Sequence, residues 1–262
     1  MGPLGVFPRP RPRLVHNILF YSATCDQKSG YVKQWRGEAV VVEVGSYRGE
    51  ELVAFKGLVR KYYTYEPSPP KFSYIHQAII DNGMEGVVTF RPVAASDHAG
   101  EATFYVPLAA GGTHQDSFGN IDFMDPSRRS IQVPMVRLDD EIHERVHLLK
   151  VDTQGHELAV MKGAEGIIRK YGIDVIHIEF APGLIRGQGR GHKPEDFLDY
   201  MWQLGYTCMY CNSPFGLPPA NLPTIDGERA GPWTWEKFTN DFGEYPHMPG
   251  PGHGAFGDLV CI

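Results

Sequence analysis

The chain has 262 residues, of which 42% are hydrophobic and 21% are charged, and this composition excludes a wholly disordered protein. The formal net charge is −6, which gives no general attraction for a phosphate backbone, so we expect no nucleic-acid partner. No apolar run approaches the roughly 20 residues of a membrane-spanning helix, and the Pro- and Arg-rich start lacks the apolar core of a signal peptide, so we expect a cytoplasmic protein with no membrane partner.

Strand and helix patterns alternate along most of the chain. The first strand is predicted at 39–44, a continuous run of β-branched residues typical of a strand buried on both faces. A helical pattern with regularly spaced apolar residues follows at 49–61, and a second helix opens with two prolines at 69 and stops at 82. The remaining predicted strands are 62–65, 86–92, 101–107, 131–138, 146–151, 173–180, 206–210 and 258–262, and the remaining predicted helices are 157–171 and 194–204.

This alternation predicts a Rossmann-like α/β domain with a mostly parallel central sheet and helices on both faces. We expect the domain over 39–262, preceded by an N-terminal extension, 1–38, with a Pro-rich start. Polar loops interrupt the pattern at 109–120 and 212–254. The second loop is rich in Pro and Gly and indicates a surface excursion, and both loops are where substrate specificity is expected.

A glycine turn follows the first predicted strand and leads into a helix. Gly45 and Gly49 allow the backbone to turn tightly and to approach a ligand without an intervening Cβ, and the acid Glu43 precedes them. The GxxxG spacing differs from the GxGxxG of a dinucleotide site, which weakens the alternative of a nicotinamide-dependent oxidoreductase. Considered alone, the turn is equally well explained as a structural connection with a buried, hydrogen-bonded Glu43.

The second predicted strand ends at an acid, Glu66, about 20 residues after the glycine turn. In Rossmann-like folds an acid at this point binds the ribose of a bound nucleotide. A carboxylate suits this task because its two oxygens accept hydrogen bonds from two neighbouring hydroxyls. The competing explanation is a surface glutamate before a Pro-rich turn.

With these two elements in place, the chain resembles the FkbM-type methyltransferase family. The resemblance implies a class I methyltransferase fold, S-adenosylmethionine as cofactor, and methyl transfer to oxygen, most often on a small-molecule or sugar hydroxyl. It rests on six motifs in order, VVEVGSYRGEELVAF, YTYEPSPPKF, VAASDHAGEATFYV, VPMVRLDDEI, LLKVDTQGHELAVMKGAEGII and IDVIHIEF.

The resemblance also implies which residues bind the cofactor. The glycine turn would contact the methionine end, Glu66 the ribose, and the residues after the third strand the adenine edge. Asp97 would accept a hydrogen bond from the exocyclic amine, although a turn residue before Gly100 explains it equally well. The implied cofactor-binding residues are Glu43, Gly45, Ser46, Gly49, Glu66, Ser96 and Asp97.

Catalytic candidates follow the fourth strand of the Rossmann pattern, where the reactive methyl group lies in this fold. Asp152 and His156 are the candidates for accepting the acceptor's proton. His156 has an equally good explanation as a solvated residue at a helix start. A divalent metal is possible but not favoured, and its candidate ligands are Asp152, Glu157 and Glu179.

Two places depart from the family pattern. The first motif commonly has Asp followed by Gly-Ala-Asn, whereas here it has Glu43 and Gly45-Ser46-Tyr47, with Tyr47 and Arg48 bulkier than the family residues. In the fourth-strand motif, Gln154 stands where the family commonly has an acid. The loss of that acid would alter substrate choice or remove a metal ligand. These departures keep open a third hypothesis, a non-catalytic protein that retains the cofactor pocket.

The four cysteines are too few for a disulfide scaffold. Cys208 and Cys211 form a CxxC, but no second pair or HxxxH completes a zinc site. We therefore interpret them as two buried or free thiols.

Overall fold

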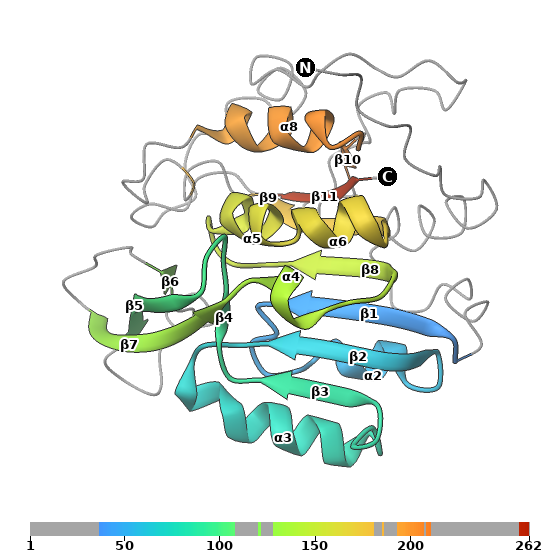
Figure 1. The fold of residues 1–262 in the computed structure, drawn as a ribbon. Coiled ribbons are helices and arrows are strands. Elements are labelled where there is room, and N and C mark those ends of the chain that lie inside the picture. The colour runs from blue at the N-terminus through green and yellow to red at the C-terminus, as the bar shows by residue number, and fades with distance from the viewer. Residues whose placement is uncertain are drawn as a thin grey trace.

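The computed structural model describes residues 37–107, 120–121, 128–180, 185, 193–206, 208–210 and 257–261. Seven strands form a central sheet in the order β3-β2-β1-β8-β9-β11-β10, and a smaller second sheet lies beside the edge toward which the arrowheads of β1, β2 and β8 point (Figure 1). The strands of the central sheet are β1 (Ala39–Val44), β2 (Val59–Tyr65), β3 (Val88–Arg91), β8 (Val146–Val151), β9 (Ile173–Phe180), β10 (Cys208–Tyr210) and β11 (Gly257–Cys261).

The directions and order of the strands confirm the predicted fold class. β1 runs parallel to β2 and β8, β2 runs parallel to β3, and β8 runs parallel to β9. β11 is antiparallel to both of its neighbours and lies inside the sheet between β9 and β10. The chain extends the sheet from β1 in one direction and returns to extend it from β8 in the other, so a topological switch point lies between these two strands. Ligands bind at that point in Rossmann-like sheets.

Two hydrophobic cores cover the two faces of the central sheet. Successive residues of β1 alternate between them, with Val40 and Val42 in one core and Ala39 and Val41 in the other. The first core receives apolar residues of α5 (Glu157–Gly163), α6 (Glu165–Lys170) and α8 (Pro194–Gln203), and the second receives those of α2 (Leu52–Phe55) and α3 (Phe72–Asp81). Within the described part of the chain, none of the helices combines the length and apolarity needed for membrane crossing.

The second sheet has the order β4-β7-β5-β6, and its long strands β5 and β7 pair antiparallel. Phe104, Val133 and Met135 belong to its own small core. A short helix, α4, leads from this sheet back to β8. The elements are β4 (Ala94–Ala95), β5 (Gly100–Pro107), β6 (Asn120–Ile121), β7 (Arg128–Val136) and α4 (Leu138–Glu141), and a 3-10 turn, η2 (Pro69–Lys71), precedes α3.

The predicted helix 49–61 is wrong over most of its length. Only α2, four residues long, is helical, and the chain enters β2 at Val59. Lys56, at ψ 124°, ends the helix, Gly57 at φ +75° completes the turn, and Val59 and Tyr62 are then buried as strand residues. The predicted helix 157–171 is divided into α5 and α6 at Ala164, whose ψ of 1° leaves the helical region.

The prediction for the CxxC cysteines is wrong for Cys208. It forms a disulfide with Cys261, which lies directly opposite on the neighbouring strand β11. Sequence spacing gave no signal for this pair, because its members lie 53 positions apart in the chain. Cys25 and Cys211 lie outside the described residues. The same is true of residues 1–36 of the predicted extension 1–38, most of the predicted loop 109–120, and the whole predicted excursion 212–254.

Candidate functional site

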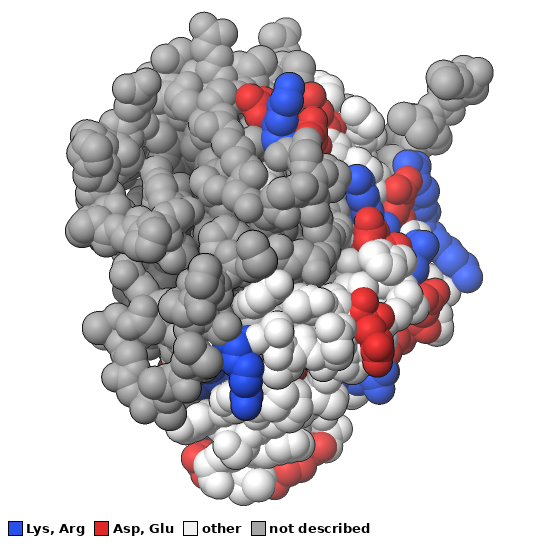
Figure 2. All heavy atoms as spheres, turned by 90° about the vertical axis from the view of Figure 1, so that its left-hand side faces the viewer, with Lys and Arg blue, Asp and Glu red and all other residues white. Residues whose placement is uncertain are grey.

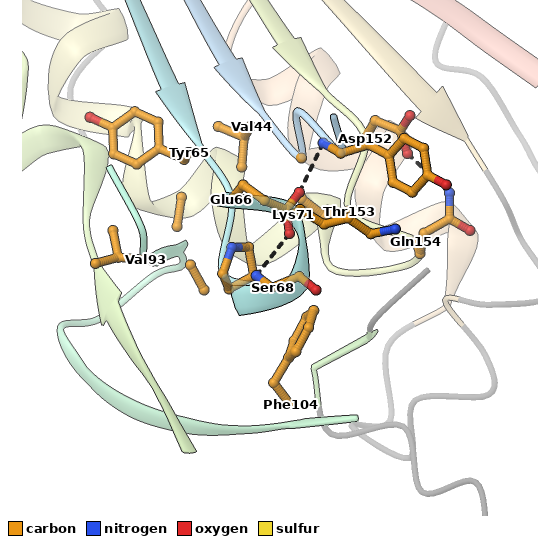
Figure 3. A pocket seen from close by; sticks show the side chains of 15 residues that line it. Val44, Tyr65, Glu66, Ser68, Lys71, Val93, Phe104, Asp152, Thr153 and Gln154 are labelled. Carbon is orange, nitrogen blue, oxygen red and sulfur yellow. Dashed lines mark hydrogen bonds between the residues drawn. The ribbon is translucent and has the colours of Figure 1, made fainter. Parts of the chain in front are cut away.

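A pocket lies at the carboxyl ends of β1, β2 and β8, at the switch point of the central sheet (Figure 3). It holds about 620 Å³ of empty space, its open mouth included. Its lining combines two acidic residues and one lysine with apolar residues of both sheets. The lining residues are Val44, Gly45, Tyr47, Tyr65, Glu66, Pro67, Ser68, Lys71, Val93, Ala94, Ala95, Phe104, Asp152, Thr153 and Gln154.

The floor of the pocket is the junction of β1 and β8. The backbone N–H of Asp152 donates to the carbonyl of Val44 at 2.9 Å, and the N–H of Gly45 donates to the carbonyl of Tyr65 at 2.9 Å. Gly45 has φ +85°, a left-handed conformation that glycine adopts without steric cost. The glycine turn thus joins three strand ends at one point.

Glu66 lies in the pocket wall with only 6% of its surface exposed. Its Oε2 accepts a hydrogen bond from the backbone N–H of Tyr47 at 2.9 Å, and its Oε1 accepts one from the N–H of Ser68 at 2.9 Å (Figure 3). Burial raises the pKa of Glu66 to about 7, and these two N–H donors and Lys71 offset part of the rise. Each carboxylate oxygen retains a second lone pair, so the group can also accept hydrogen bonds from the hydroxyls of a ligand.

Two lining residues other than glycine have a left-handed backbone, Tyr47 at φ +52° and Gln154 at φ +54°. This conformation is uncommon for such residues and costs of order 1–3 kcal/mol unless the surroundings impose it. Both residues are among those that depart from the family pattern. Residues with a strained backbone are enriched at binding and catalytic sites, which agrees with the position of these two residues in the pocket lining.

The side chain of Gln154 connects two carboxylates beside the pocket. Its Nε2 donates to Oδ1 of Asp152 at 3.0 Å and also to Oε2 of Glu179, which comes from β9. An amide with two N–H groups can satisfy two acceptors at once. Asp152 is therefore held by a neutral donor rather than by a charged partner.

Glu157 stabilises the loop that carries Asp152 and Gln154. Its Oε1 accepts hydrogen bonds from the backbone N–H of Gly155 at 2.9 Å and from the N–H and hydroxyl of Thr153 at 3.2 and 3.1 Å. The carboxyl group is fully buried, and burial raises its pKa to about 7 although these hydrogen bonds lower it. Glu157 is not among the pocket-lining residues.

The candidate metal ligands Asp152, Glu157 and Glu179 do not converge. In the part of the chain that the structure describes, no three His, Cys, Asp or Glu side chains are placed to hold a metal ion together. Asp152 and Glu179 instead share the amide of Gln154. The described donor set therefore does not fit a divalent ion.

Glu43 lies in a buried charge cluster next to the pocket rather than in its lining. Its Oε2 accepts a hydrogen bond from the hydroxyl of Thr64 at 3.1 Å, and its Oε1 is 4.0 Å from the ammonium of Lys150. Lys150 also forms an ion pair with Glu51. Burial raises the pKa of Glu43, and the charge of Lys150 opposes this rise.

Among the residues implied for the methionine end, Gly45 lines the pocket. Ser46 is buried outside the lining, and Gly49 packs against Leu52 and Ala78 at the start of the helical layer.

Ser96 and His156, which we assigned to different tasks, contact each other. Nε2 of His156 is 3.0 Å from Oγ of Ser96, and both side chains are buried. Asp97 lies next to Ser96 and interacts with the ring of His98 at 2.6 Å. These residues are outside the pocket lining, whereas the two preceding alanines of β4 are part of it.

Sequence reasoning missed Lys71 and Phe104 as lining residues. Lys71 had a usable signal, because it follows Glu66 in the same short turn after the second strand. Phe104 belongs to the second sheet, and only the tertiary structure brings it to the end of the first.

Comparison with known proteins gives a match to the model of the methyltransferase FkbM domain over residues 43–208. The solved structure of a methyltransferase FkbM from Methylobacillus flagellatus is 15% identical, with a TM-score of 0.45, and the match covers 78% of this chain and 52% of that one. An rRNA methylase from Streptococcus thermophilus is 12% identical, with a TM-score of 0.42 and coverage of 88% and 90%.

A third solved structure, a protein of Streptococcus mutans described as a methyltransferase candidate in complex with SAH, is 8% identical, with a TM-score of 0.43 and coverage of 96% and 97%. No curated protein matches the chain. This chain spans about half the length of the Methylobacillus protein. The family model, however, matches more than half of this chain, and it begins at Glu43 and includes the strand ends that form the pocket. The protein belongs to the FkbM methyltransferase family.

Proposed function

We propose that this protein transfers the methyl group of S-adenosylmethionine to a hydroxyl oxygen of a small molecule or sugar. The observation that carries the proposal is the position of Glu66, a buried carboxylate at the end of β2 that opens into the switch-point pocket. The alternative of a nicotinamide-dependent oxidoreductase rested on the fold alone, and the family match favours methyl transfer instead.

The pocket fits the parts of this cofactor. Glu66 would accept hydrogen bonds from the ribose hydroxyls, and the apolar side chains of Val93 and Phe104 suit an adenine ring. Gly45 lines the pocket at the end of β1, where a side chain would collide with the backbone of Asp152. When bound, S-adenosylmethionine supplies an electrophilic methyl group.

The chain's own residues have to hold the acceptor and remove its proton. Asp152 lies in the pocket wall, so we propose it as the group that accepts the hydroxyl proton. The amide of Gln154 fixes the orientation of its carboxylate. His156 is a weaker candidate because its ring is buried against Ser96.

The nature of the surface supports a small acceptor. Figure 2 shows the face at the carboxyl ends of the strands, where the described lysines and arginines at the right and at the top lie among aspartates and glutamates, and the basic side chains near the lower centre have no acidic neighbour in view. A protein that binds nucleic acid through its backbone gathers cations on one face. The described part of this face shows no such gathering.

Calorimetric titration with S-adenosylhomocysteine, with and without EDTA, tests the cofactor assignment. We expect micromolar binding that EDTA leaves unchanged. Glu66→Ala should weaken binding about tenfold or more, because two hydrogen bonds to a buried carboxylate are lost. Glu165→Ala is the matched control, since Glu165 lies on α6 outside the pocket. Equal affinity of the Glu66→Ala variant and the wild type would contradict the ribose assignment.

The acceptor class is tested by measuring S-adenosylhomocysteine release with hydroxyl, carboxyl, amine and RNA acceptors. Turnover with hydroxyl compounds supports the proposal, and turnover confined to amines or RNA overturns it. Cofactor binding without turnover on any acceptor would favour the hypothesis of a non-catalytic binding protein.

A further inference from the structure

Lys71 is a buried cation in the pocket wall. It ends the turn η2, only 7% of its surface is exposed, and it is the single Lys, Arg or His among the lining residues that the structure describes. Its Nζ lies 4.0 Å from the ring centroid of Tyr47. Figure 3 shows Lys71 between Glu66 and Gln154.

The ammonium of Lys71 has no hydrogen-bond or ion-pair partner among the described residues. It has three N–H donors, and its nitrogen is not among the fully buried atoms of the described residues, so acceptors of a ligand in the pocket can reach it. The face of the Tyr47 ring supplies a cation–π contact, which satisfies none of these donors as a hydrogen bond. Glu66 attracts the ammonium through space, but no hydrogen bond or ion pair joins Lys71 to it, and the hydrogen bonds that its two oxygens accept within the described residues come from Tyr47 and Ser68.

Tyr47 fixes the lysine relative to the carboxylate. Its backbone N–H donates to Glu66, and its ring lies under the ammonium of Lys71. The left-handed φ of Tyr47 allows one residue to make both contacts. The positive and negative groups of the pocket are thereby held at fixed positions, which is the preorganisation that a zwitterionic or anionic ligand requires.

We propose that Lys71 is the anion-binding residue of this pocket and that it binds a carboxylate or phosphate group. The inference rests on the proposed function, which places the nucleoside at Glu66. The anion then belongs either to the methionine end of the cofactor or to the acceptor. In both cases the ammonium gains charge-assisted hydrogen bonds that the described residues do not supply.

The first experiment compares two nucleosides that differ only in the carboxylate, S-adenosylhomocysteine and its decarboxylated form, by calorimetry. If the anion is that of the cofactor, the wild type binds S-adenosylhomocysteine about tenfold or more tightly than the decarboxylated form, and Lys71→Met removes this difference. Lys71→Arg should preserve most of it. Lys61→Met is the matched control, because Lys61 also lies over a tyrosine ring, that of Tyr63, but outside the pocket.

The second experiment titrates the protein, saturated with S-adenosylhomocysteine, with inorganic phosphate and with acetate. Binding that Lys71→Met abolishes assigns the anion to the acceptor. The proposal is overturned if Lys71→Met changes neither the nucleoside preference nor anion binding. It is also overturned if the variant loses binding together with thermal stability, since this indicates a structural role. Failure of the proposed function is seen separately, because the wild type then binds neither nucleoside.

Discussion

A Cβ atom on Gly45 would lie 1.8 Å from the backbone carbonyl oxygen of Asp152. No real Cβ approaches an oxygen so closely, so only glycine permits this packing of the end of β1 on the end of β8. The same contact places Asp152 at the pocket floor, below the proposed cofactor site. The glycine of the first motif is therefore required by the sheet itself, in addition to any contact it makes with a ligand.

Gly45→Ala should destabilise the protein by about 3 kcal/mol, from the clash with Asp152 and from the left-handed φ. Gly57→Ala is the matched control, because Gly57 has φ +75° but open space around its Cβ position. We expect the control to lose only about 1 kcal/mol, the cost of the conformation alone. Urea unfolding of both variants measures the difference. Equal losses would show that β1 moves away from β8 at no cost.

Strands buried on both faces were the most predictable part of the fold. The predicted bounds 39–44, 146–151 and 173–180 agree with β1, β8 and β9 at both ends. For β1 the reason is its run of β-branched residues, which is too short for a typical helix and suits a strand buried on both faces. The predicted helix 49–61 failed because apolar residues at helical spacing also fit a short helix followed by a strand. The left-handed backbone of Gly57 permits the turn from the short helix into the strand, and the spacing of apolar residues does not register a single glycine.

The candidate site was predictable where a residue follows a strand end directly. Gly45, Glu66 and Asp152 meet this condition, and all three line the pocket. Gln154 also lines it, but its contact with Glu179 joins the loop after β8 to strand β9, and no local pattern shows such a contact. The pairing of Ser96 with His156 likewise depends on the tertiary structure.

Binding of S-adenosylhomocysteine should strengthen as the pH rises toward 8. Burial raises the pKa of Glu66 from 4.5 to about 7, so below pH 7 the carboxyl group carries a proton and accepts fewer hydrogen bonds from ribose. We expect affinity to fall about tenfold per pH unit below this pKa. Calorimetry between pH 5.5 and 8.5 measures the profile. A wild-type profile that matches that of Glu66→Ala would contradict the assignment.

The folding stability of the unliganded protein should decrease as the pH rises, whereas the affinity for S-adenosylhomocysteine increases. The folded state retains protons on Glu66 and Glu157 that the unfolded chain releases above pH 4.5. Folding stability therefore decreases as the pH rises from about 4.5 to about 7, and it is level above this range. Urea unfolding across these pH values tests the sign. Glu157→Gln should reduce the slope, and an unchanged slope in this variant would exclude Glu157 as a source.

Reduction of the disulfide between Cys208 and Cys261 should destabilise the end of the sheet. The bond closes a loop with a sequence separation of 53, for which the chain-entropy relation gives about 4 kcal/mol. Urea unfolding with and without dithiothreitol measures the loss. The double variant Cys208→Ser, Cys261→Ser is the control, and it should be equally stable in both conditions. Sensitivity of this control to the reductant would assign the effect to Cys25 or Cys211 instead.

Gln154→Glu should convert the carboxylate pair beside the pocket into a metal site. The wild-type amide donates to Asp152 and Glu179, whereas a carboxylate at this position adds a third negative charge that repels both. Three carboxylates at one point favour Mn²⁺ or Mg²⁺. We expect the variant to be less stable than the wild type in EDTA and to regain thermal stability when Mn²⁺ is added. Gln132→Glu, at an exposed position of β7, controls for the added charge and should not respond to Mn²⁺. A Gln154→Glu variant that is stable in EDTA and indifferent to Mn²⁺ would show that the amide does not hold the two carboxylates together.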